Sequence, residues 1–485
     1  MTSNKRAGGV IIVGAGEAGQ LLAHEIDGQK GVAFHIIGFV DDNQAMADQP
    51  PGKHPILGAV SDLAEIVQAH GAKEILIALP SQRGAVVRDI LLSTAGLGLT
   101  YRILPRLSEV LLQDYDMGFL KFVRKLEVED LLGGEILKSD QQDIAEFVEG
   151  KTLFITGAAG SIGSELSRQL AAYKAKKIIF YDWWENGMFE LRNQLLESYD
   201  EKTFEFIIGD IKDRKKLNRI LKLHKPHTIF HAAAYKHVPL MEGSNAAEAV
   251  KNNIVGTKIV GELAIKHGVK KFILVSTDKA VNPTNVMGAT KRAAEKVAHI
   301  LAGSQDKTTF CAVRFGNVIN SNGSAIPFFR KQIARGGPVT VTHTGITRYF
   351  MTIPEAVHLI LQSWTIGENN DLFVLDMGES VRIYDLARAL IALEGSTPDQ
   401  EIEIDIIGLR PGEKLYEEVL MEEEGLDATE VMKVYRTKNY MNFDSEIFID
   451  KLEALVDLLD DDDCDEDVIK DQLQGMISTY SPRRG

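Results

Sequence analysis

Two segments of this chain combine an apolar strand, a glycine-rich turn and a helix in direct succession. Residues 10–13 (VIIV) run into the turn 14–19 (GAGEAG), and residues 152–156 (TLFIT) run into the turn 157–163 (GAAGSIG). Closely spaced glycines permit a tight turn and let a phosphate approach the amino end of the following helix. Because such units open parallel sheets with helices on both faces, the chain is expected to contain two doubly wound α/β domains.

The first of these domains is predicted for residues 1–110 as a Rossmann-like fold of the nucleotide-binding type, followed by a helical linker over 111–150. Further strands are expected at 35–40, 74–79 and 99–104, alternating with helices at 61–70 and 85–94. The candidate nucleotide-binding residues are Gly14, Gly16, Gly19 and Asp41, whose carboxylate follows the second strand, where such folds hold a ribose. The alternative is a domain that only packs against its neighbour, because a fold alone does not specify a ligand.

The second domain shows a more complete dinucleotide-binding pattern. The strand 177–181 ends at Asp182, where a carboxylate can bind both ribose hydroxyls of NAD and repels the additional phosphate of NADP. Asp210 follows the next strand near the expected adenine, and residues 228–234 end in small side chains against which a dinucleotide can lie. NAD is therefore predicted in preference to NADP. The predicted cofactor-binding residues are Gly157, Ala159, Gly160, Ser161, Ile162, Gly163, Asp182, Asp210, Ile211, Ala232, Ala233 and Ala234.

A chemically unusual stretch follows the apolar strand 271–275. Its polar residues are Ser276, Thr277, Asp278 and Lys279, and the next helix is expected to begin near Met287 and to carry Lys291. Ligands of open α/β sheets bind at the carboxyl ends of the strands, so a hydroxyl, a carboxylate and an amine side by side indicate a catalytic site. The alternative is a solvated Asp–Lys pair on an exposed loop.

Length, charge and cysteine content exclude several classes of protein. The chain has 485 residues, too many for a single core, and its net charge of −15 argues against nucleic-acid binding. Two cysteines are too few for a disulfide framework and fit a reducing, cytoplasmic location. No stretch approaches the roughly 20 apolar residues of a membrane helix. No His and Cys cluster has metal-ligand spacing, so no metal is expected.

Residues 151 to about 420 resemble the extended short-chain dehydrogenases/reductases that act on nucleotide sugars. The motifs that carry this resemblance are 156–163 (TGAAGSIG), 231–234 (HAAA), 276–279 (STDK), 314–318 (RFGNV) and 410–414 (RPGEK). With the first domain included, nearly the whole chain resembles the long, two-domain UDP-N-acetylglucosamine 4,6-dehydratases of bacterial polysaccharide biosynthesis and protein glycosylation. The resemblance implies a catalytic domain over 151–440 with a smaller C-terminal substrate-binding subdomain, and an acidic helical tail over 441–485.

One departure from the wider superfamily is informative. The usual catalytic motif of the superfamily is Tyr-x-x-x-Lys, but the position of the Tyr is here taken by Met287, four residues before Lys291. A methionine cannot take a proton. The long dehydratases that the chain resembles carry the same replacement, which implies the subgroup that retains the configuration at C5 of the sugar.

The resemblance implies a redox-neutral reaction in which hydride leaves C4 for NAD⁺, water is lost across C5 and C6, and hydride returns to C6. It implies Asp278 as the acid at C6, Lys279 as the base at C5, Thr277 at the C4 oxygen and Lys291 at the nicotinamide ribose. Asp278 and Lys279 are expected to point at different substrate atoms, protonated and neutral respectively, because direct pairing favours both charged forms. The implied substrate-binding residues are Lys236, Asn317, Arg348, Arg410 and Glu413.

Other interpretations stay open. A nucleotide-sugar 4-epimerase would use the same fold and NAD but normally keeps the Tyr, and a C5-inverting 4,6-dehydratase would return the proton to the other face. A nucleotide-binding regulatory protein would need no acid–base pair. The resemblance further implies a homodimer or higher homo-oligomer, formed through the helix that carries Lys291 and its neighbour. Long relatives usually carry membrane helices ahead of the first domain, so attachment to the membrane is an open alternative to a purely cytoplasmic protein.

Overall fold

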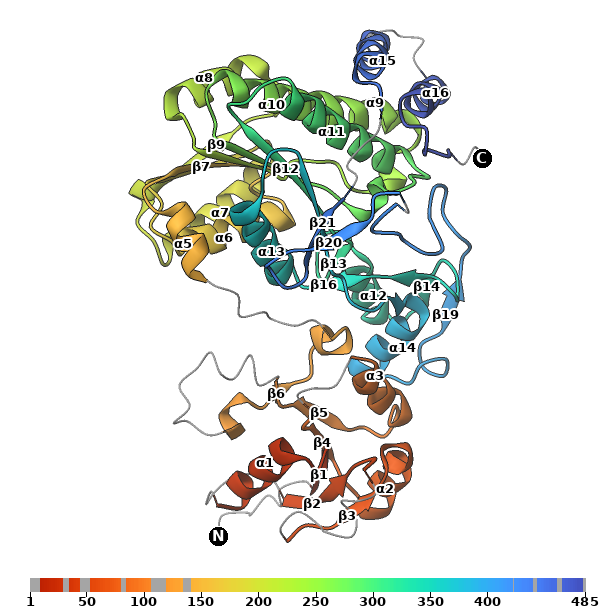
Figure 1. Ribbon diagram of the computed structural model, residues 1–485. Helices are drawn as coiled ribbons and strands as arrows, with labels where there is room; N and C mark the ends of the chain where they lie inside the picture. Colours follow the sequence, from red (N-terminus) through yellow and green to blue (C-terminus); the bar gives the residue numbers. More distant parts are fainter. Residues whose placement is uncertain are drawn as a thin grey trace. The chain divides into compact units, whose positions relative to one another are not determined.

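The computed structural model describes residues 9–28, 35–43, 53–79, 84–105, 119–133, 141–421, 423–438, 443–459 and 465–482. They form two compact units, each assembled from separate stretches of the chain (Figure 1). Unit 1 contains residues 1–138, 325–345 and 381–407, and unit 2 contains residues 139–324, 346–380 and 408–485. Within the predicted acidic tail, residues 441–442, 460–464 and 483–485 lie outside the described residues.

Unit 1 is built on a six-stranded sheet in the order β3-β2-β1-β4-β5-β6. Its strands are β1 (Gly9–Val13), β2 (His35–Val40), β3 (Ile56–Gly58), β4 (Glu74–Ile77), β5 (Thr100–Ile103) and β6 (Arg124–Lys125). All neighbours pair in parallel except β6, which runs antiparallel to β5. The helices of these crossovers are α1 (Glu17–Gly28), α2 (Leu63–His70) and α3 (Gly84–Ser93). The predicted Rossmann-like arrangement is confirmed.

Segments from the C-terminal half of the chain complete unit 1. They are α12 (Ala325–Ile333), β14 (Val339–Val341), α14 (Ile383–Leu393) and β19 (Ile404–Ile406). Strand β14 pairs in parallel with β19, and α14 packs against α3 (Figure 1). This packing joins residues almost three hundred positions apart, and no local sequence pattern predicts it.

Unit 2 is built on a nine-stranded sheet in the order β20-β21-β17-β12-β11-β10-β7-β8-β9. Its strands are β7 (Thr152–Thr156), β8 (Lys177–Asp182), β9 (Phe204–Ile208), β10 (Thr228–His231), β11 (Lys271–Val275), β12 (Thr309–Arg314), β17 (Asp371–Leu375), β20 (Leu426–Ala428) and β21 (Val434–Thr437). The seven strands from β9 to β17 pair in parallel, and only β21 and β20 add antiparallel edges. The order reverses direction at β7, as in a doubly wound sheet.

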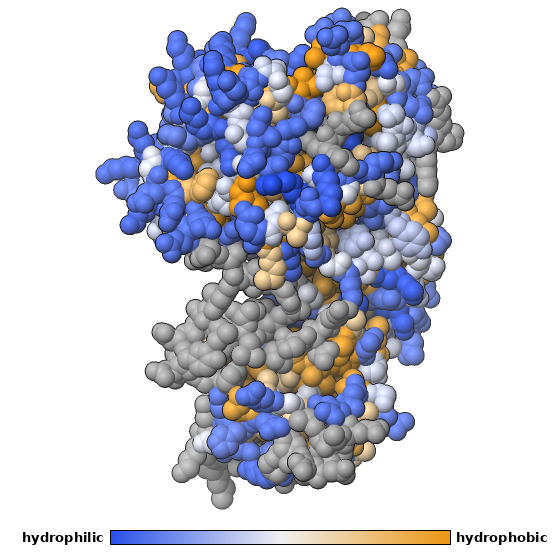
Figure 2. Space-filling view, viewed as in Figure 1, coloured by the Kyte–Doolittle hydropathy of each residue, from blue (hydrophilic) through white to orange (hydrophobic). Residues whose placement is uncertain are grey.

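Helices cover both faces of this sheet, which confirms the predicted fold class (Figure 1). One face carries α8 (Arg214–His224), α10 (Thr257–Lys266) and α11 (Val286–Gly303), and the other carries α5 (Gln141–Val148), α6 (Ser161–Ala171), α7 (Glu185–Leu196) and α13 (Ile353–Ile366). Apolar residues of the strands and of the first set of helices form one core cluster. The outer side of α8 is basic, and Figure 2 shows a mostly hydrophilic surface over it.

Helix α11 is covered by the chain itself. Every residue from Val286 to Ala298 is buried. The C-terminal helices α15 (Ser445–Leu458) and α16 (Glu466–Met476) share an apolar cluster with it, to which Met287, Val297, Leu455 and Leu473 belong. The Lys296 ammonium donates a hydrogen bond to the Met476 carbonyl over 3.1 Å. Helices α15 and α16 therefore cover this face of α11, and the homo-oligomer expected from the resemblance stays a prediction.

Removing a side chain from this cluster should destabilise the protein. Leu473→Ala deletes a fully buried side chain between α16 and α11 and is expected to lower the free energy of unfolding by about 2–4 kcal/mol. Gln474→Ala, at an exposed position of the same helix, should change it by about 0.5 kcal/mol or less. Urea titration compares the two. Equal stability of both variants would mean that α16 does not pack on α11.

Candidate active site

Close packing of backbone around the turn after β7 requires glycine at two of its positions. Gly157 has a φ of +67°, and a Cβ at this position would lie 2.6 Å from the Ala233 nitrogen. A Cβ on Gly163 would lie 2.0 Å from the Gly157 oxygen. Helix α6 begins at Ser161, so its first amides point into this turn. The turn therefore forms a cradle in which a phosphate can lie against backbone.

Asp182 lies beside this turn, as predicted. Its Oδ2 accepts a hydrogen bond from the Ala159 amide (3.0 Å) and its Oδ1 accepts one from the Trp184 amide (2.9 Å). Burial raises the pKa of Asp182, although these amide hydrogen bonds act in the opposite direction. Each oxygen keeps a further lone pair that can accept a ribose hydroxyl.

The other predicted cofactor-binding residues differ in whether their side chains are buried in the core. Asp210 is half-buried after β9, and its Oδ1 accepts the Lys212 amide over 2.8 Å. Ala232 to Ala234 follow β10 next to Gly157. Ile211, in contrast, is buried in the core cluster of the sheet. Its side chain serves packing, so only its backbone can face a ligand.

The turn after β1 repeats the arrangement of carboxylate and amide. The Oδ2 of Asp41 accepts the Ala15 amide (2.7 Å), and its Oδ1 accepts the Asn43 amide (2.8 Å). A Cβ at Gly14 or Gly19 would collide with backbone, whereas Gly16 has open space around it. Gly14 and Gly19 are thus required by the turn itself.

Thr277, Asp278 and Lys279 lie directly after β11, where Asp278 begins the short helix η10 (Asp278–Ala280). Asp278 is fully buried. Its Oδ1 accepts hydrogen bonds from the Lys279 ammonium and the Thr277 hydroxyl, both over 2.9 Å. Its Oδ2 is buried and has no hydrogen-bond partner among the described residues. One carboxylate oxygen of Asp278 therefore lacks the hydrogen bond that a buried charged oxygen normally has.

The direct pairing of Asp278 and Lys279 corrects the expectation that they point at different atoms. The Lys279 ammonium also donates to the Asn317 Oδ1 over 3.1 Å. Burial alone would lower the pKa of Lys279, but the carboxylates of Asp278 and Glu417 outweigh it, and the pKa is raised. In this arrangement Lys279 is therefore charged rather than neutral.

Helix α11, which follows this loop, carries two further predicted site residues, Lys291 and Met287. The Lys291 ammonium donates to the Val275 carbonyl over 2.8 Å, next to Ser276. Burial lowers the pKa of Lys291 to about 8, although Glu295 acts in the opposite direction. Met287 is buried in the apolar cluster of α11 with the C-terminal helices. Met287 thus fills space at the superfamily's Tyr position and provides no proton acceptor.

Sequence reasoning did not identify His231 as part of a buried relay. The Thr257 hydroxyl donates to the Asn253 carbonyl (2.7 Å), so it accepts from His231 Nε2 (2.9 Å). His231 Nδ1 then accepts from the Thr156 hydroxyl over 2.7 Å. Burial and the nearby Lys291 charge lower the pKa of His231 to about 3, so it is neutral. The relay ties the ends of β7 and β10 together beneath the glycine turn.

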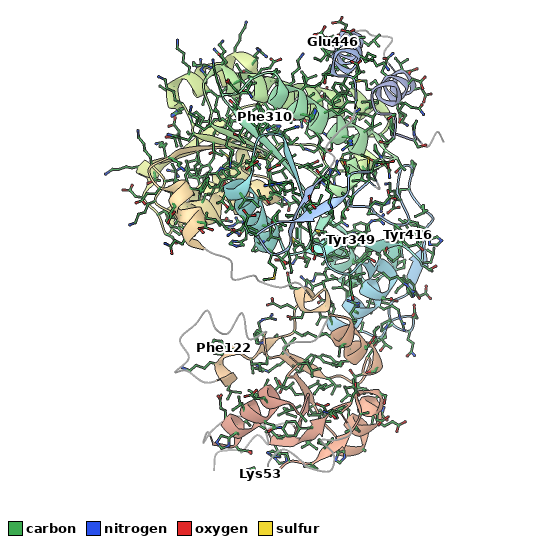
Figure 3. The ribbon with its side chains drawn as sticks, in the orientation of Figure 1. Lys53, Phe122, Phe310, Tyr349, Tyr416 and Glu446 are labelled. Atoms are coloured by element: carbon green, nitrogen blue, oxygen red, sulfur yellow. The ribbon has the colours of Figure 1, made fainter. Side chains whose placement is uncertain are left out.

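Of the predicted substrate-binding residues, Arg348 already has hydrogen-bond partners within the protein. Arg348 donates to the carbonyls of Thr347 (2.7 Å), Lys414 (2.8 Å) and Leu415 (3.3 Å), so it braces the 413–417 segment rather than presenting a free guanidinium. Figure 3 labels Tyr349 and Tyr416, the chain neighbours of Arg348 and of Glu417.

Two cations near this segment are better placed to meet an anion. Arg410 is exposed, and the described residues offer its guanidinium no partner, while its backbone amide donates to Glu413 Oε2 over 3.1 Å. Lys236 is likewise exposed and has no ion-pair partner in the described part of the chain. Desolvation of its ammonium and the Lys279 charge lower the pKa of Lys236. Both residues are available to bind phosphate.

The described residues contain no group of three or more His, Cys, Asp and Glu side chains arranged to hold a metal ion. No helix within the described ranges has the length and apolar character to cross a bilayer.

Comparison with known proteins gives two family matches. Residues 153–439 match the model of the polysaccharide biosynthesis protein family, and residues 1–105 match a CoA-binding domain model. The chain is 43% identical to the probable polysaccharide biosynthesis protein EpsC of Bacillus subtilis, over 85% of this chain and 68% of that protein. It is 36% identical to a UDP-N-acetylglucosamine 4,6-dehydratase (inverting) of Campylobacter jejuni, over 55% of this chain and 77% of that protein.

Among solved structures, Pen from Bacillus thuringiensis matches 61% of this chain and 90% of its own. The TM-score is 0.56 and the sequence identity 32%. This likeness supports the doubly wound fold described above.

Proposed function

The chain belongs to the polysaccharide biosynthesis protein family, and from this premise we propose that it is a 4,6-dehydratase acting on UDP-N-acetylglucosamine. One observation carries the proposal: at the carboxyl end of β11, the buried carboxylate of Asp278 is hydrogen-bonded to a lysine through one oxygen, while its other oxygen has no hydrogen-bond partner in the described part of the chain. A binding protein needs no such acid–base pair. The buried Met287, where an epimerase normally has its Tyr, favours dehydration over 4-epimerisation.

The residues around the glycine turn fit a nicotinamide dinucleotide. Side chains at Gly157 and Gly163 would collide with the protein backbone, so glycine keeps this turn tight enough for a pyrophosphate to approach it, and Asp182 lies beside the turn with lone pairs for a ribose. The position of Asp182 favours NAD over NADP. Such a cofactor supplies a hydride acceptor and donor. Lys291 would hold its nicotinamide ribose, as expected from the resemblance.

Removing the carboxylate of Asp182 should weaken NAD retention. Asp182→Ala is expected to lower the affinity for NAD by about 10- to 100-fold, because hydrogen bonds to a charged group are lost. NAD released from the denatured, gel-filtered protein measures this. Asp200→Ala is the matched control, since Asp200 is an exposed carboxylate that also accepts a backbone amide. Equal NAD content in both variants would remove Asp182 from the cofactor site.

The hydrogen bond between Lys279 and Asp278 provides a route to the protonation states that the elimination needs. The elimination needs a proton for the departing C6 hydroxyl and a base for the C5 proton. Transfer of one proton along the 2.9 Å hydrogen bond from Lys279 to Asp278 converts the resting ion pair into a neutral acid and a neutral base. A bound sugar that excludes water favours this neutral form. Asp278 then protonates the C6 oxygen, Lys279 takes the C5 proton, and Thr277 holds the C4 oxygen.

We further infer that the substrate's diphosphate is held by Arg410 and Lys236, cations without an ion-pair partner among the described residues, with Asn317 and Glu413 nearer the sugar and uridine. Retention at C5 is proposed from the two-domain architecture and Met287. The Campylobacter jejuni relative is named as inverting, which is a property of that protein. Reaction in deuterated water, followed by NMR at C5 of the product, distinguishes retention from inversion.

The proposed function is tested by incubating the protein with UDP-N-acetylglucosamine and no added cofactor, followed by mass spectrometry. The expected product has lost one water. Conversion to the galacto isomer at unchanged mass would instead identify a 4-epimerase. No conversion even after addition of NAD or NADP would contradict the proposed substrate and leave a nucleotide-binding protein as the better explanation.

A further inference from the structure

A second carboxylate lies beside Lys279, contributed by a distant part of the chain. The Oε1 of Glu417 is 3.8 Å from the Lys279 ammonium and 3.7 Å from the Arg348 Nε. The Glu417 side chain is only 5% exposed. Its Oε2 is buried and has no hydrogen-bond partner among the described residues. A buried carboxylate oxygen without a partner is energetically unfavourable, and a role at a catalytic site is one explanation for it.

The Lys279 ammonium therefore has two carboxylate neighbours, which lie at different distances from it. The nearer is Asp278, at 2.9 Å, and the farther is Glu417, at 3.8 Å. The ammonium cannot act at the substrate while it stays bound to Asp278, and Asp278 cannot donate a proton while it neutralises the ammonium. A lysine side chain is long and flexible enough to exchange partners over this difference of about one ångström.

We propose that Glu417 is a positioning residue for Lys279: it holds the ammonium that forms when Lys279 has taken the C5 proton and Asp278 has turned to the sugar. This inference rests on the proposed dehydratase function. In the elimination Lys279 takes the C5 proton and becomes positive while Asp278 gives up its proton to the C6 oxygen. The Glu417 carboxylate stabilises the charge that develops on Lys279, and its free Oε2 offers a hydrogen-bond acceptor at that moment.

The charges around Lys279 define what removing Glu417 should do. Asp278 and Glu417 favour the charged form of Lys279, whereas Arg348 and the nearby Lys236 oppose it. Replacing Glu417 with Gln keeps the size of the side chain but removes one of the two favourable charges. The pKa of Lys279 should therefore fall, and the pH limb of activity that belongs to Lys279 should move to lower pH.

Trace acetylation measures this without substrate. The rate at which acetic anhydride modifies Lys279, read from its peptide by mass spectrometry at a series of pH values, gives the midpoint of its titration. Glu417→Gln should shift this midpoint to lower pH, and Glu417→Asp, which keeps the charge, should leave it closer to that of the wild type. Glu418→Gln is the matched control, because Glu418 is half-exposed and pairs with Lys414 instead. The control midpoint should not move.

Activity provides the second readout. With UDP-N-acetylglucosamine, Glu417→Gln is expected to lower kcat by about tenfold, less than the loss of an acid–base group itself, with KM nearly unchanged. A midpoint that stays at the wild-type pH in both Glu417 variants would overturn the role of Glu417, even if the wild type proves to be a dehydratase. Absence of wild-type dehydration would instead overturn the proposed function, and the acetylation result would still decide whether Glu417 tunes Lys279.

Discussion

Replacing Lys279 with Met should lower the turnover of UDP-N-acetylglucosamine by about 10²- to 10⁴-fold, the contribution of a positioned acid or base. The methionine keeps the length of the aliphatic chain but cannot take the C5 proton. It also leaves the fully buried Asp278 without its ion-pair partner. Initial rates of water loss, measured by mass spectrometry on variants with wild-type circular dichroism, test this.

The control for this prediction is Lys270→Met, an exposed lysine next to the start of β11. It should turn over at the wild-type rate. Asp278→Asn should lose as much activity as Lys279→Met, and the double variant should be little worse than either, because the two residues act as a unit. A Lys279→Met protein within tenfold of the wild-type rate would contradict the acid–base assignment.

Replacing Arg314 with Met should lower the free energy of unfolding by about 3–5 kcal/mol, because it leaves buried carboxylates without their partner. Arg314 is completely buried at the end of β12. It donates two hydrogen bonds of 2.7 Å to Glu295 and one of 2.7 Å to Glu424. Arg292 contributes a further contact to each of these carboxylates.

This network lies directly beneath the proposed catalytic loop. The Ser276 hydroxyl donates to Glu295 Oε1 over 2.6 Å, so the network fixes the residue immediately before Thr277. Glu295 also lies one helical turn after Lys291 on α11. The expected destabilisation should therefore be accompanied by a loss of activity, since the loop is no longer held by its support.

The network should also make stability depend on pH. Burial alone would raise the pKa of Glu295, but the guanidinium groups of Arg314 and Arg292 and the Ser276 hydroxyl hold it at about 2. A carboxyl whose pKa is lower in the folded than in the unfolded state stabilises the fold above its unfolded pKa. This contribution should be lost as the pH falls from about 4.5 through about 2.

The matched control is Arg330→Met, which removes an arginine from an ion pair with Glu394 in which both side chains are about 40% exposed. Exposed pairs contribute about 0–1 kcal/mol. Urea titrations of Arg314→Met, Arg330→Met and the wild type at neutral pH compare the two. Similar losses in both variants would show that the buried network is not the stronger interaction.

The sequence predicted those features that depend on neighbouring residues. The glycine turns, the apolar strands and the carboxylates at the strand ends are local patterns, so both parallel sheets and the place of Asp182 beside Gly157 followed from them. The stretch from Thr277 to Lys279 was predicted to be catalytic for the same reason, since the carboxyl end of a parallel strand is where ligands bind.

Features that depend on long-range packing were missed. Glu417 reaches Lys279 from 138 positions along the chain, and nothing in its neighbourhood signals this. Arg348 was expected to bind substrate, but its guanidinium donates hydrogen bonds to carbonyls of the 413–417 segment. The raised pKa of Lys279 could not be foreseen, because it depends on both carboxylates together. The cover of α11 by α15 and α16 is a further long-range contact.

The most direct test of the central claim uses UDP-N-acetylglucosamine that carries deuterium at C4, with no added cofactor. If hydride leaves C4, is held within the protein and returns to C6, the product must have lost one water and must carry the deuterium at C6. NMR and mass spectrometry of the product decide this. A product at unchanged mass with the deuterium still at C4 would show epimerisation, and a dehydrated product without deuterium would show that hydride is not returned within one active site; either result would contradict the account.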